Sequence, residues 1–275
     1  MTKEEKFAFG KNWQSYVKNY LNNERINEAK DSLLKFFNVY NFQDKSFIDI
    51  GCGSGLFSLA AHQLGASKVV SFDLDPFSVK CCEYLKEMNG NPSNWEIING
   101  SILDDKFLPS LEKYDIVYSW GVLHHTGNMW KAIENTLNLV QNKGLLYIAI
   151  YNKINFLGLF PDGRFGSSRF WLGEKKIYSK LPLLLQNIID YAVMIVLILL
   201  YIITFKNPVR KIKEHKKLRG MSWRIDIKDW LGGYPYEYAS VDEIFIFMKK
   251  FGFCLENLKC YDGLGNNEFL FRKLE

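Results

Sequence analysis

The chain has 275 residues, a length suited to one large domain or two small ones. Hydrophobic residues make up 48% and charged residues 24%, which is ordinary globular usage and excludes a wholly disordered or fibrous chain. The net charge of +5 is concentrated in one place, because residues 206–219 hold seven basic side chains against Glu214 alone, a net charge of +6. The rest of the chain therefore carries −1, which excludes a uniformly cationic coat protein for nucleic acid.

Cysteine and histidine usage bears on metals and on location. The five cysteines form no CxxC pair and no metal-ligand cluster with the four histidines, so we expect no metal site. Residues 1–6 do not resemble a signal peptide. We therefore expect a cytoplasmic protein with reduced thiols, and a peripheral position at the inner face of the membrane stays open.

Strands and helices alternate along most of the chain. Residues 1–45 are expected to form an N-terminal helical lid, since Trp13–Phe37 carries apolar side chains at helical spacing. The elements expected after it are strand Phe47–Ile50, helix Leu56–Leu64, strand Lys68–Asp73, helix Pro76–Met88, strand Trp95–Asn99, strand Asp115–Ser119, helix Asn128–Val140, strand Gly144–Ile150, helix Val241–Phe251, strand Phe253–Cys260 and strand Glu268–Arg272.

This order predicts an α/β fold with a Rossmann-like, seven-stranded and mostly parallel sheet, because parallel crossovers need a helix. The last two strands are joined by a turn too short for a crossover, so they should form an antiparallel terminal hairpin. The core would comprise residues 46–154, completed by residues 239–275. Residues 155–238 break the alternation and are expected to form a largely helical insertion between strands 5 and 6, placed as a substrate cap.

The first strand leads into a glycine-rich loop. Residues 49–55 read Asp-Ile-Gly-Cys-Gly-Ser-Gly, and such glycines let the backbone approach a ligand closely. The GxGxG spacing, with Asp49 two residues before it, differs from the GxGxxG of dinucleotide sites. Asp73 ends the next strand, where a carboxylate can accept both hydroxyls of a ribose. The pattern therefore predicts a nucleoside-containing ligand at the carboxyl edge of the sheet.

With these motifs, residues 47–150 and 241–272 resemble the class I S-adenosylmethionine-dependent methyltransferases. The resemblance implies S-adenosyl-L-methionine as cofactor, S-adenosyl-L-homocysteine as product, and an O-methyltransferase as the expected enzyme. It implies that Gly51, Gly53 and Gly55 face the methionine part, that Asp73 holds the ribose, and that Leu74 lies against adenine. Residues 100–102 would flank the adenine amino group, with a serine at 101 where many relatives have an acid. The predicted cofactor residues are Trp13, Tyr16, Asp49, Gly51, Cys52, Gly53, Gly55, Asp73, Leu74, Ser101, Ile102, Ser119 and Trp120.

Four further segments are similar to a narrower bacterial subgroup of methyltransferases. They are residues 9–13 with Tyr16, residues 119–126, residues 150–152 and residues 229–237. The subgroup is associated with surface-polysaccharide biosynthesis, including capsules that carry O-methyl phosphoramidate. This similarity implies a polar acceptor, either a sugar hydroxyl or a phosphoryl or phosphoramidate oxygen.

Polar side chains expected at the same edge are candidates for catalysis. His124 and His125 close the fourth strand, where one can serve as general base for a hydroxyl or simply line the pocket. Residues 229–237, rich in Tyr, Trp, Gly and Pro, read as a shaped loop rather than a helix. The predicted catalytic residues are His124, His125, Tyr151, Asn152, Tyr234, Tyr236 and Glu237.

Other functions stay open to different degrees. The residues after the fourth strand, Ser-Trp-Gly-Val at 119–122, differ from the Pro-Pro-Tyr/Phe loop of methylases of nucleobase amino groups, so nucleic acid is disfavoured as a substrate. One alternative is a membrane-surface lipid or quinone methyltransferase. A non-enzymatic alternative is a cofactor-binding scaffold or RNA-binding protein that uses the basic strip at 206–219.

Residues 183–205 form an apolar segment long enough for a membrane-spanning helix, followed at once by the basic strip. A single crossing is excluded if the sheet is as expected, because strands before and after the segment belong to that one sheet. Three interpretations remain open: a helix buried over the site or in a homodimer, a helix in the membrane surface, or one bound to a partner protein.

Overall fold

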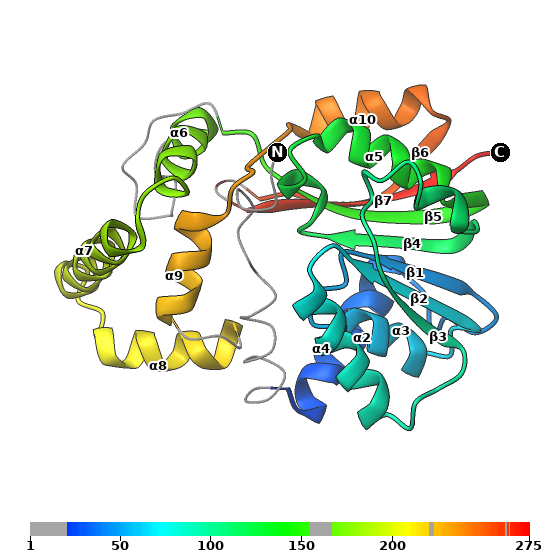
Figure 1. Ribbon diagram of the computed structural model, residues 1–275, viewed down its shortest axis with the longest axis horizontal. Helices are drawn as coiled ribbons and strands as arrows, with labels where there is room; N and C mark the ends of the chain where they lie inside the picture. Colours follow the sequence, from blue (N-terminus) through cyan, green and yellow to red (C-terminus); the bar gives the residue numbers. More distant parts are fainter. Residues whose placement is uncertain (1–20, 155–166, 220–222, 262, 264) are drawn as a thin grey trace.

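A seven-stranded sheet in the order β3-β2-β1-β4-β5-β7-β6 runs through the computed structural model. Strands β1 to β5 are parallel, and β7 pairs antiparallel with both β5 and β6. The predicted fold class is confirmed, including the antiparallel terminal hairpin (Figure 1). The structure describes residues 21–154, 167–219, 223–261, 263 and 265–275. The strands are β1 (Ser46–Ile50), β2 (Lys68–Asp73), β3 (Trp95–Asn99), β4 (Tyr114–Trp120), β5 (Val140–Tyr151), β6 (Phe253–Lys259) and β7 (Asn266–Lys273).

Helices cover both faces of the sheet because its strands are apolar on both sides. Phe47 packs among α2, α3 and α4, whereas its neighbour Ile48 packs among α5 and α10. Figure 1 shows these two helical layers above and below the strands. The helices are α2 (Asn23–Phe37), α3 (Leu56–Gln63), α4 (Pro76–Met88), α5 (Met129–Asn138) and α10 (Val241–Lys250).

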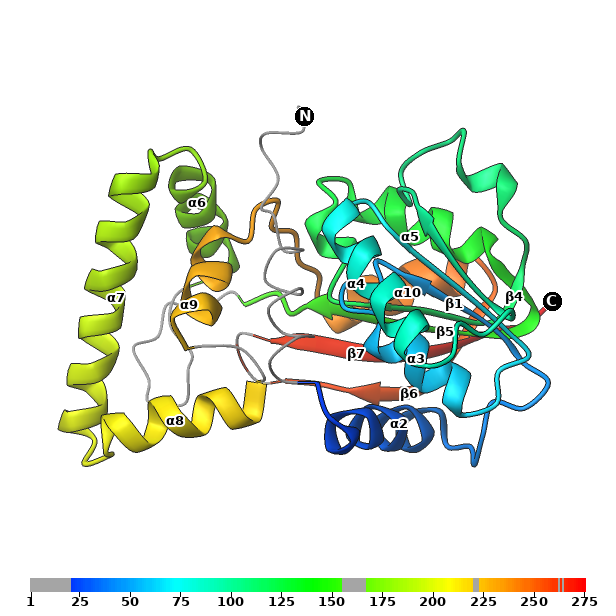
Figure 2. The same cartoon turned by 60° about the horizontal axis from the view of Figure 1, so that its bottom comes forward.

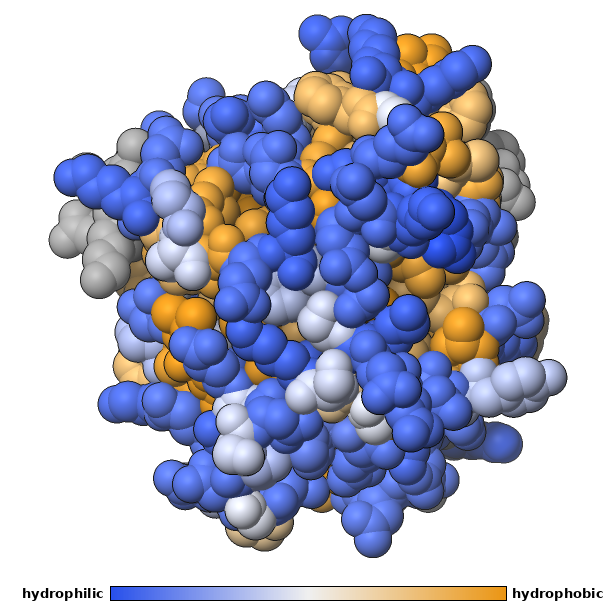
Figure 3. Space-filling model, turned by 90° about the vertical axis from the view of Figure 1, so that its right-hand side faces the viewer, coloured by the Kyte–Doolittle hydropathy of each residue, from blue (hydrophilic) through white to orange (hydrophobic). Residues whose placement is uncertain are grey.

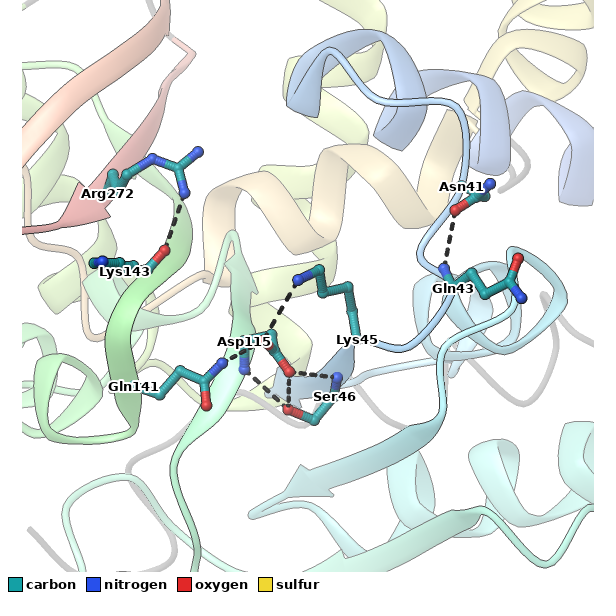
Figure 4. A network of polar contacts seen from close by, with 8 residues as sticks. All are labelled: Asn41, Gln43, Lys45, Ser46, Asp115, Gln141, Lys143 and Arg272. Atoms are coloured by element: carbon teal, nitrogen blue, oxygen red, sulfur yellow. Dashed lines mark hydrogen bonds and ion pairs between the residues drawn. The ribbon is translucent and has the colours of Figure 1, made fainter.

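A polar network ties the strands together at the edge where β1 and β4 begin. The backbone N–H and the hydroxyl of Ser46 donate to one carboxylate oxygen of Asp115 at 2.9 and 2.7 Å. The N–H of Asp115 donates back to the Ser46 hydroxyl at 2.9 Å, and Gln141 donates to the other carboxylate oxygen (Figure 4). These contacts hold β1, β4 and β5 in register at the end of the sheet opposite the predicted site.

The insertion forms a separate helical body beside the sheet (Figures 1 and 2). Tyr178, Trp223, Ile227 and Leu231 form its small buried core, packed against one face of α7. Its helices are α6 (Ser168–Tyr178), α7 (Leu183–Ile203), α8 (Pro208–Arg219) and α9 (Trp223–Gly232).

The structure corrects one expectation about this insertion. Residues 229–232 are the last turn of α9 and not part of a loop. The physical reason is the spacing of Trp223, Ile227 and Leu231, which recur every four residues and place three large apolar side chains on one helical face. That burial outweighs the turn-forming residues that follow.

Candidate functional site

The glycine loop between β1 and α3 is shaped by close packing. Gly51 and Gly55 have φ angles of +72° and +80°, which favour glycine. A Cβ on Gly51 would lie 2.5 Å from side-chain carbons of Val122, and one on Gly55 would lie 2.9 Å from the Cα of Cys82. The N–H groups of Gly51 and Cys52 donate to the Phe72 carbonyl at 2.8 and 3.1 Å. The loop is thus fixed against β2, with no room for side chains at two of its glycines.

Asp73 is held at the end of β2 by backbone donors. The N–H of Gly53 donates to one carboxylate oxygen at 3.0 Å, and the N–H of Asp75 donates to the other at 2.9 Å. Burial raises the pKa of Asp73 to about 6, against the opposing effect of these hydrogen bonds. Each oxygen keeps a further lone pair, so the carboxylate can accept two ribose hydroxyls.

Asp49 lies beneath the glycine loop at the end of a buried relay. The Ser58 hydroxyl donates to Asp49 at 2.6 Å, Ser71 donates to Ser58 at 2.8 Å, and the indole of Trp95 donates to Ser71 at 2.8 Å. Asp49 is 2% exposed, and burial raises its pKa to about 7. A buried acid with a raised pKa is suited to face a cationic group of a ligand, which would stabilise its ionised form. S-adenosylmethionine, with its ammonium and sulfonium, fits these two acids.

A cavity of about 760 Å³ runs along the carboxyl edge of the sheet, from the glycine loop to α9 of the insertion. Parallel sheets bind ligands at this edge. Most of the predicted site residues line it together: Asp49, Gly51, Cys52, Gly53, Asp73, Leu74, Ser101, Ile102, Trp120, His124, His125, Tyr151 and Tyr234.

The tautomer of His125 is set by its backbone partner. Its Nδ1 lies 2.6 Å from the Pro235 carbonyl oxygen, which can only accept, so Nδ1 carries the proton and Nε2 the lone pair. Burial lowers the pKa of His125 to about 4, so the imidazole is neutral at pH 7. His125 therefore has the protonation state of a base in the wall of the cavity.

His124 is placed differently. It is buried, and its Nδ1 accepts the N–H of Tyr151 at 3.3 Å. Burial and the neighbouring His125 hold its pKa well below the usual value. Its ring lies 3.9 Å from the ring of Tyr151, so this histidine also positions Tyr151 at the cavity.

Three residues predicted as catalytic do not line the cavity but support its walls. The carboxylate of Glu237 accepts the Met129 N–H at 3.0 and 3.1 Å, which caps the start of α5. The amide of Asn152 donates to the Tyr261 carbonyl at 2.9 Å and joins β5 to the turn before β7. Tyr236 is buried with its ring 5.1 Å from that of Tyr151.

Two predicted cofactor residues also lie behind the cavity wall. Ser119 is buried and donates to the Ile50 carbonyl at 3.1 Å, and Gly55 is the first residue before α3. Trp13 and Tyr16, predicted in the lid, lie outside the described residues.

Sequence reasoning missed the contribution of α9 to the cavity. Asp226, Asp229 and Trp230 line its end away from the glycine loop. Burial raises the pKa of Asp229 to about 7, with Asp226 acting in the same direction. The ammonium of Lys175 lies 4.5 Å over the Trp230 ring, and burial lowers the pKa of this lysine to about 8. The four-residue spacing at Trp223, Ile227 and Leu231 is the signal that marks this helix in the sequence.

Comparison of sequences matches the chain to known proteins over part of its length. Residues 31–148 match the family model of ribosomal protein L11 methyltransferase. A ubiquinone biosynthesis O-methyltransferase of Pelagibacter ubique is 26% identical over 47% of this chain and 53% of its own length. A ribosomal protein L11 methyltransferase of Macrococcus caseolyticus is 33% identical over 41% of this chain and 34% of its own length. The chain thus spans between a third and about half of these relatives.

Solved structures share the fold over nearly the whole chain. A magnesium protoporphyrin IX methyltransferase of Synechocystis with bound SAM has a TM-score of 0.53 at 11% identity, covering 96% of this chain and 90% of that one. An S-adenosylmethionine-dependent methyltransferase structure from Listeria monocytogenes has a TM-score of 0.52 at 13% identity, covering 90% of this chain and 100% of that one. These likenesses show that the chain has the class I S-adenosylmethionine-dependent methyltransferase fold. The glycine loop, Asp73 and the matched segment support S-adenosylmethionine as cofactor.

Proposed function

We propose that the protein is an S-adenosylmethionine-dependent methyltransferase that methylates an oxygen of a polar acceptor, a sugar hydroxyl or a phosphoryl oxygen. One observation carries the proposal for a hydroxyl acceptor: neutral His125, with its lone pair on Nε2, lines the same cavity as the glycine loop and Asp73. A cofactor site and a base in one cavity are the two parts that methyl transfer to a hydroxyl requires.

The chain's residues would divide the work by position. Bound S-adenosylmethionine supplies a methyl group activated on a sulfonium. Asp73 and the glycine loop hold the nucleoside and amino-acid parts, while the cavity walls align the acceptor and exclude water. His125 Nε2 takes the proton from an acceptor hydroxyl as the oxygen attacks. A phosphoryl oxygen is already anionic, so it needs orientation by donors more than a base.

The finer part of the proposal is a role in surface-polysaccharide biosynthesis. It rests on the similarity of residues 119–126, 150–152 and 229–237 to that subgroup, and on the polar groups at the α9 end of the cavity. His125, Asp226 and Asp229 can bond to several hydroxyls at once, as a saccharide presents them. The protein would then work on precursors in the cytoplasm.

A second candidate is a lipid or quinone acceptor. It is favoured by the exposed apolar face of α7, whose neighbour α9 lines the cavity. The ubiquinone biosynthesis relative, matched over half of its length, points in the same direction. In this case the acceptor hydroxyl would reach His125 from a lipid environment.

The test supplies methyl-labelled S-adenosylmethionine and the purified protein to fractionated native extract. Label in nucleotide-sugar or polysaccharide fractions supports the first candidate, and label in the lipid fraction supports the second. The assay must also include protein fractions, because one of the relatives is a ribosomal protein methyltransferase. Label confined to protein or RNA contradicts both candidates. Absence of any binding of S-adenosylhomocysteine would overturn the proposal as a whole.

A further inference from the structure

The longest helix of the insertion leaves an apolar stripe uncovered. Its exposed side chains recur at spacings of three or four residues along the whole of α7, so they lie on one face. Each is between about half and three quarters exposed, and none is charged. Further exposed apolar side chains of α7 lie beside this row. The row itself, which we call the α7 stripe, consists of Leu184, Ile188, Tyr191, Ile195, Leu199 and Ile202.

The opposite face of α7 packs against the other helices of the insertion and holds the one acid of this helix. Ile189, Val193 and Leu197 pack inward on α6 and α9. Asp190, the one ionisable acid in α7, also points inward, is fully buried and accepts the Tyr178 hydroxyl at 2.6 Å. The helix is therefore apolar on both faces, although only one is covered by the described residues. It is long and apolar enough to cross a membrane, and only 6% of its most apolar window is buried.

Positive charge borders the stripe. Exposed Arg210, Lys211 and Lys213 lie on α8, which follows α7 directly. From α9, the guanidinium of Arg224 lies 4.9 Å from the centre of the Tyr191 ring within the stripe. Figures 1 and 2 show α7 at the outer limit of the insertion, on its side away from the sheet, and α8 running from the end of α7 back toward the core.

We infer that the α7 stripe and the basic side chains beside it form a docking surface for an anionic lipid bilayer. The helix lies in the plane of the membrane surface, its stripe buried among the acyl chains nearest the headgroups, while Arg210, Lys211, Lys213 and Arg224 meet lipid phosphates. A second copy of the chain is the weaker occupant, since it would bring the same positive charge to the interface. Anionic lipid brings the opposite charge.

The fold excludes a crossing by α7. Strands β5 and β7 pair along their length, one from before and one from after the insertion. Both ends of α7 therefore return to the same body, and its inner face is occupied by α9. On the opposite side of the molecule, hydrophilic side chains separate the apolar patches of the described residues (Figure 3).

With α7 on the membrane surface, α9 is the helix that lies between α7 and the end of the cavity away from the glycine loop. Helix α9 contacts α7 through Trp223, Ile227 and Leu231, and lines the cavity with Asp226 and Trp230. The consequence that the acceptor comes from the membrane surface rests on the proposed function. The docking itself does not.

Co-sedimentation with vesicles, without cofactor or acceptor, tests the docking. The full chain is mixed with vesicles of phosphatidylcholine alone or with added phosphatidylglycerol. We expect binding only to the anionic vesicles, weakened by salt. The double variant Ile195→Glu with Leu199→Glu should reduce binding by at least about tenfold. Lys211→Glu with Lys213→Glu should also reduce it by about tenfold or more, since each cation near an anionic surface contributes.

Matched controls change similar residues outside the docking surface. Met88→Glu replaces an exposed apolar residue of α4, and Lys249→Glu with Lys250→Glu reverses two exposed charges of α10; both should bind as the unchanged chain does. Circular dichroism checks that each variant is folded, and the α8 variant remains decisive if the α7 variant is not. Equal binding to neutral vesicles, no binding to anionic vesicles, or a stable dimer that buries the stripe would overturn the inference. S-adenosylhomocysteine binding, measured separately, would be unaffected in every case.

Discussion

The sheet core and the helical insertion treat apolar surface in opposite ways. In the core, strands such as β1 are buried on both faces, and the acids Asp49 and Asp73 are held at the wall of a cavity. In the insertion, α7 leaves its apolar stripe uncovered and turns its one acid, Asp190, inward. The inferred membrane docking accounts for this difference, because lipid would cover the stripe that the described residues leave exposed.

The first prediction sharpens the chemical side of this comparison and has the largest expected effect. If an acceptor hydroxyl is methylated, His125→Ala removes the base and should lower kcat by about 10²- to 10⁴-fold. Affinity for S-adenosylhomocysteine should change little, because His125 is not among the residues proposed to hold the nucleoside and amino-acid parts. The change in kcat is measured by steady-state kinetics with the acceptor that the labelling experiment identifies.

His62→Ala is the matched control, since His62 lies on α3 outside the cavity lining. Unchanged kcat in the His125 variant would mean that the acceptor needs no base, as expected for an anionic phosphoryl oxygen.

The second prediction separates the stability of the insertion from that of the core. Tyr178→Phe leaves the buried carboxylate of Asp190 without its hydroxyl donor, and its second oxygen already has no hydrogen-bond partner among the described residues. We expect the insertion to lose about 1–3 kcal/mol of stability. Hydrogen exchange should rise in α6, α7 and α9 and stay constant in the sheet.

Tyr191→Phe serves as its control, because this tyrosine of the same helix is about half exposed. Faster exchange throughout the sheet in the Tyr178 variant would show that the insertion and core unfold as one unit.

The third prediction concerns pH and the core alone. Burial raises the pKa of Asp73 to about 6 and that of Asp49 to about 7. The ionised carboxylates bind the ribose hydroxyls and the cationic groups, so affinity for the cofactor should be full near pH 8. It should fall by about tenfold or more by pH 5, as both groups are protonated. Calorimetric titration across this range measures it, and a constant affinity would contradict the ionised state assigned to Asp73.

Vesicle binding provides the matching contrast. Binding to anionic vesicles does not involve Asp49 or Asp73, so it should not fall between pH 8 and pH 5. The two regions would then differ in pH response as they do in structure.

The core was predictable because local signals and global fold agree there. Alternating strands and helices predicted the parallel part of the sheet, and the glycine loop with Asp73 predicted where a nucleoside could bind. The supporting roles of Glu237 and Asn152 were not predictable, since their partners Met129 and Tyr261 lie 108 and 109 residues away in the chain.

The insertion was less predictable for a different reason. The turn-forming residues around Tyr234 concealed the helix that supplies Asp226 and Asp229, although its four-residue apolar spacing was visible. Asp190 faces the protein interior because it accepts a hydrogen bond from Tyr178. Composition and hydropathy give no information about this contact.

Cofactor binding by Asp73 is central to the proposed function. Calorimetric titration of S-adenosylhomocysteine into the unchanged chain, Asp73→Ala and Asp31→Ala compares them; Asp31 is an exposed acid of α2. We predict micromolar binding to the unchanged chain and to Asp31→Ala, and a loss of about a hundredfold or more for Asp73→Ala, which removes two charge-assisted hydrogen bonds. Absence of binding to the folded, unchanged chain, or equal affinity for all three, would contradict it.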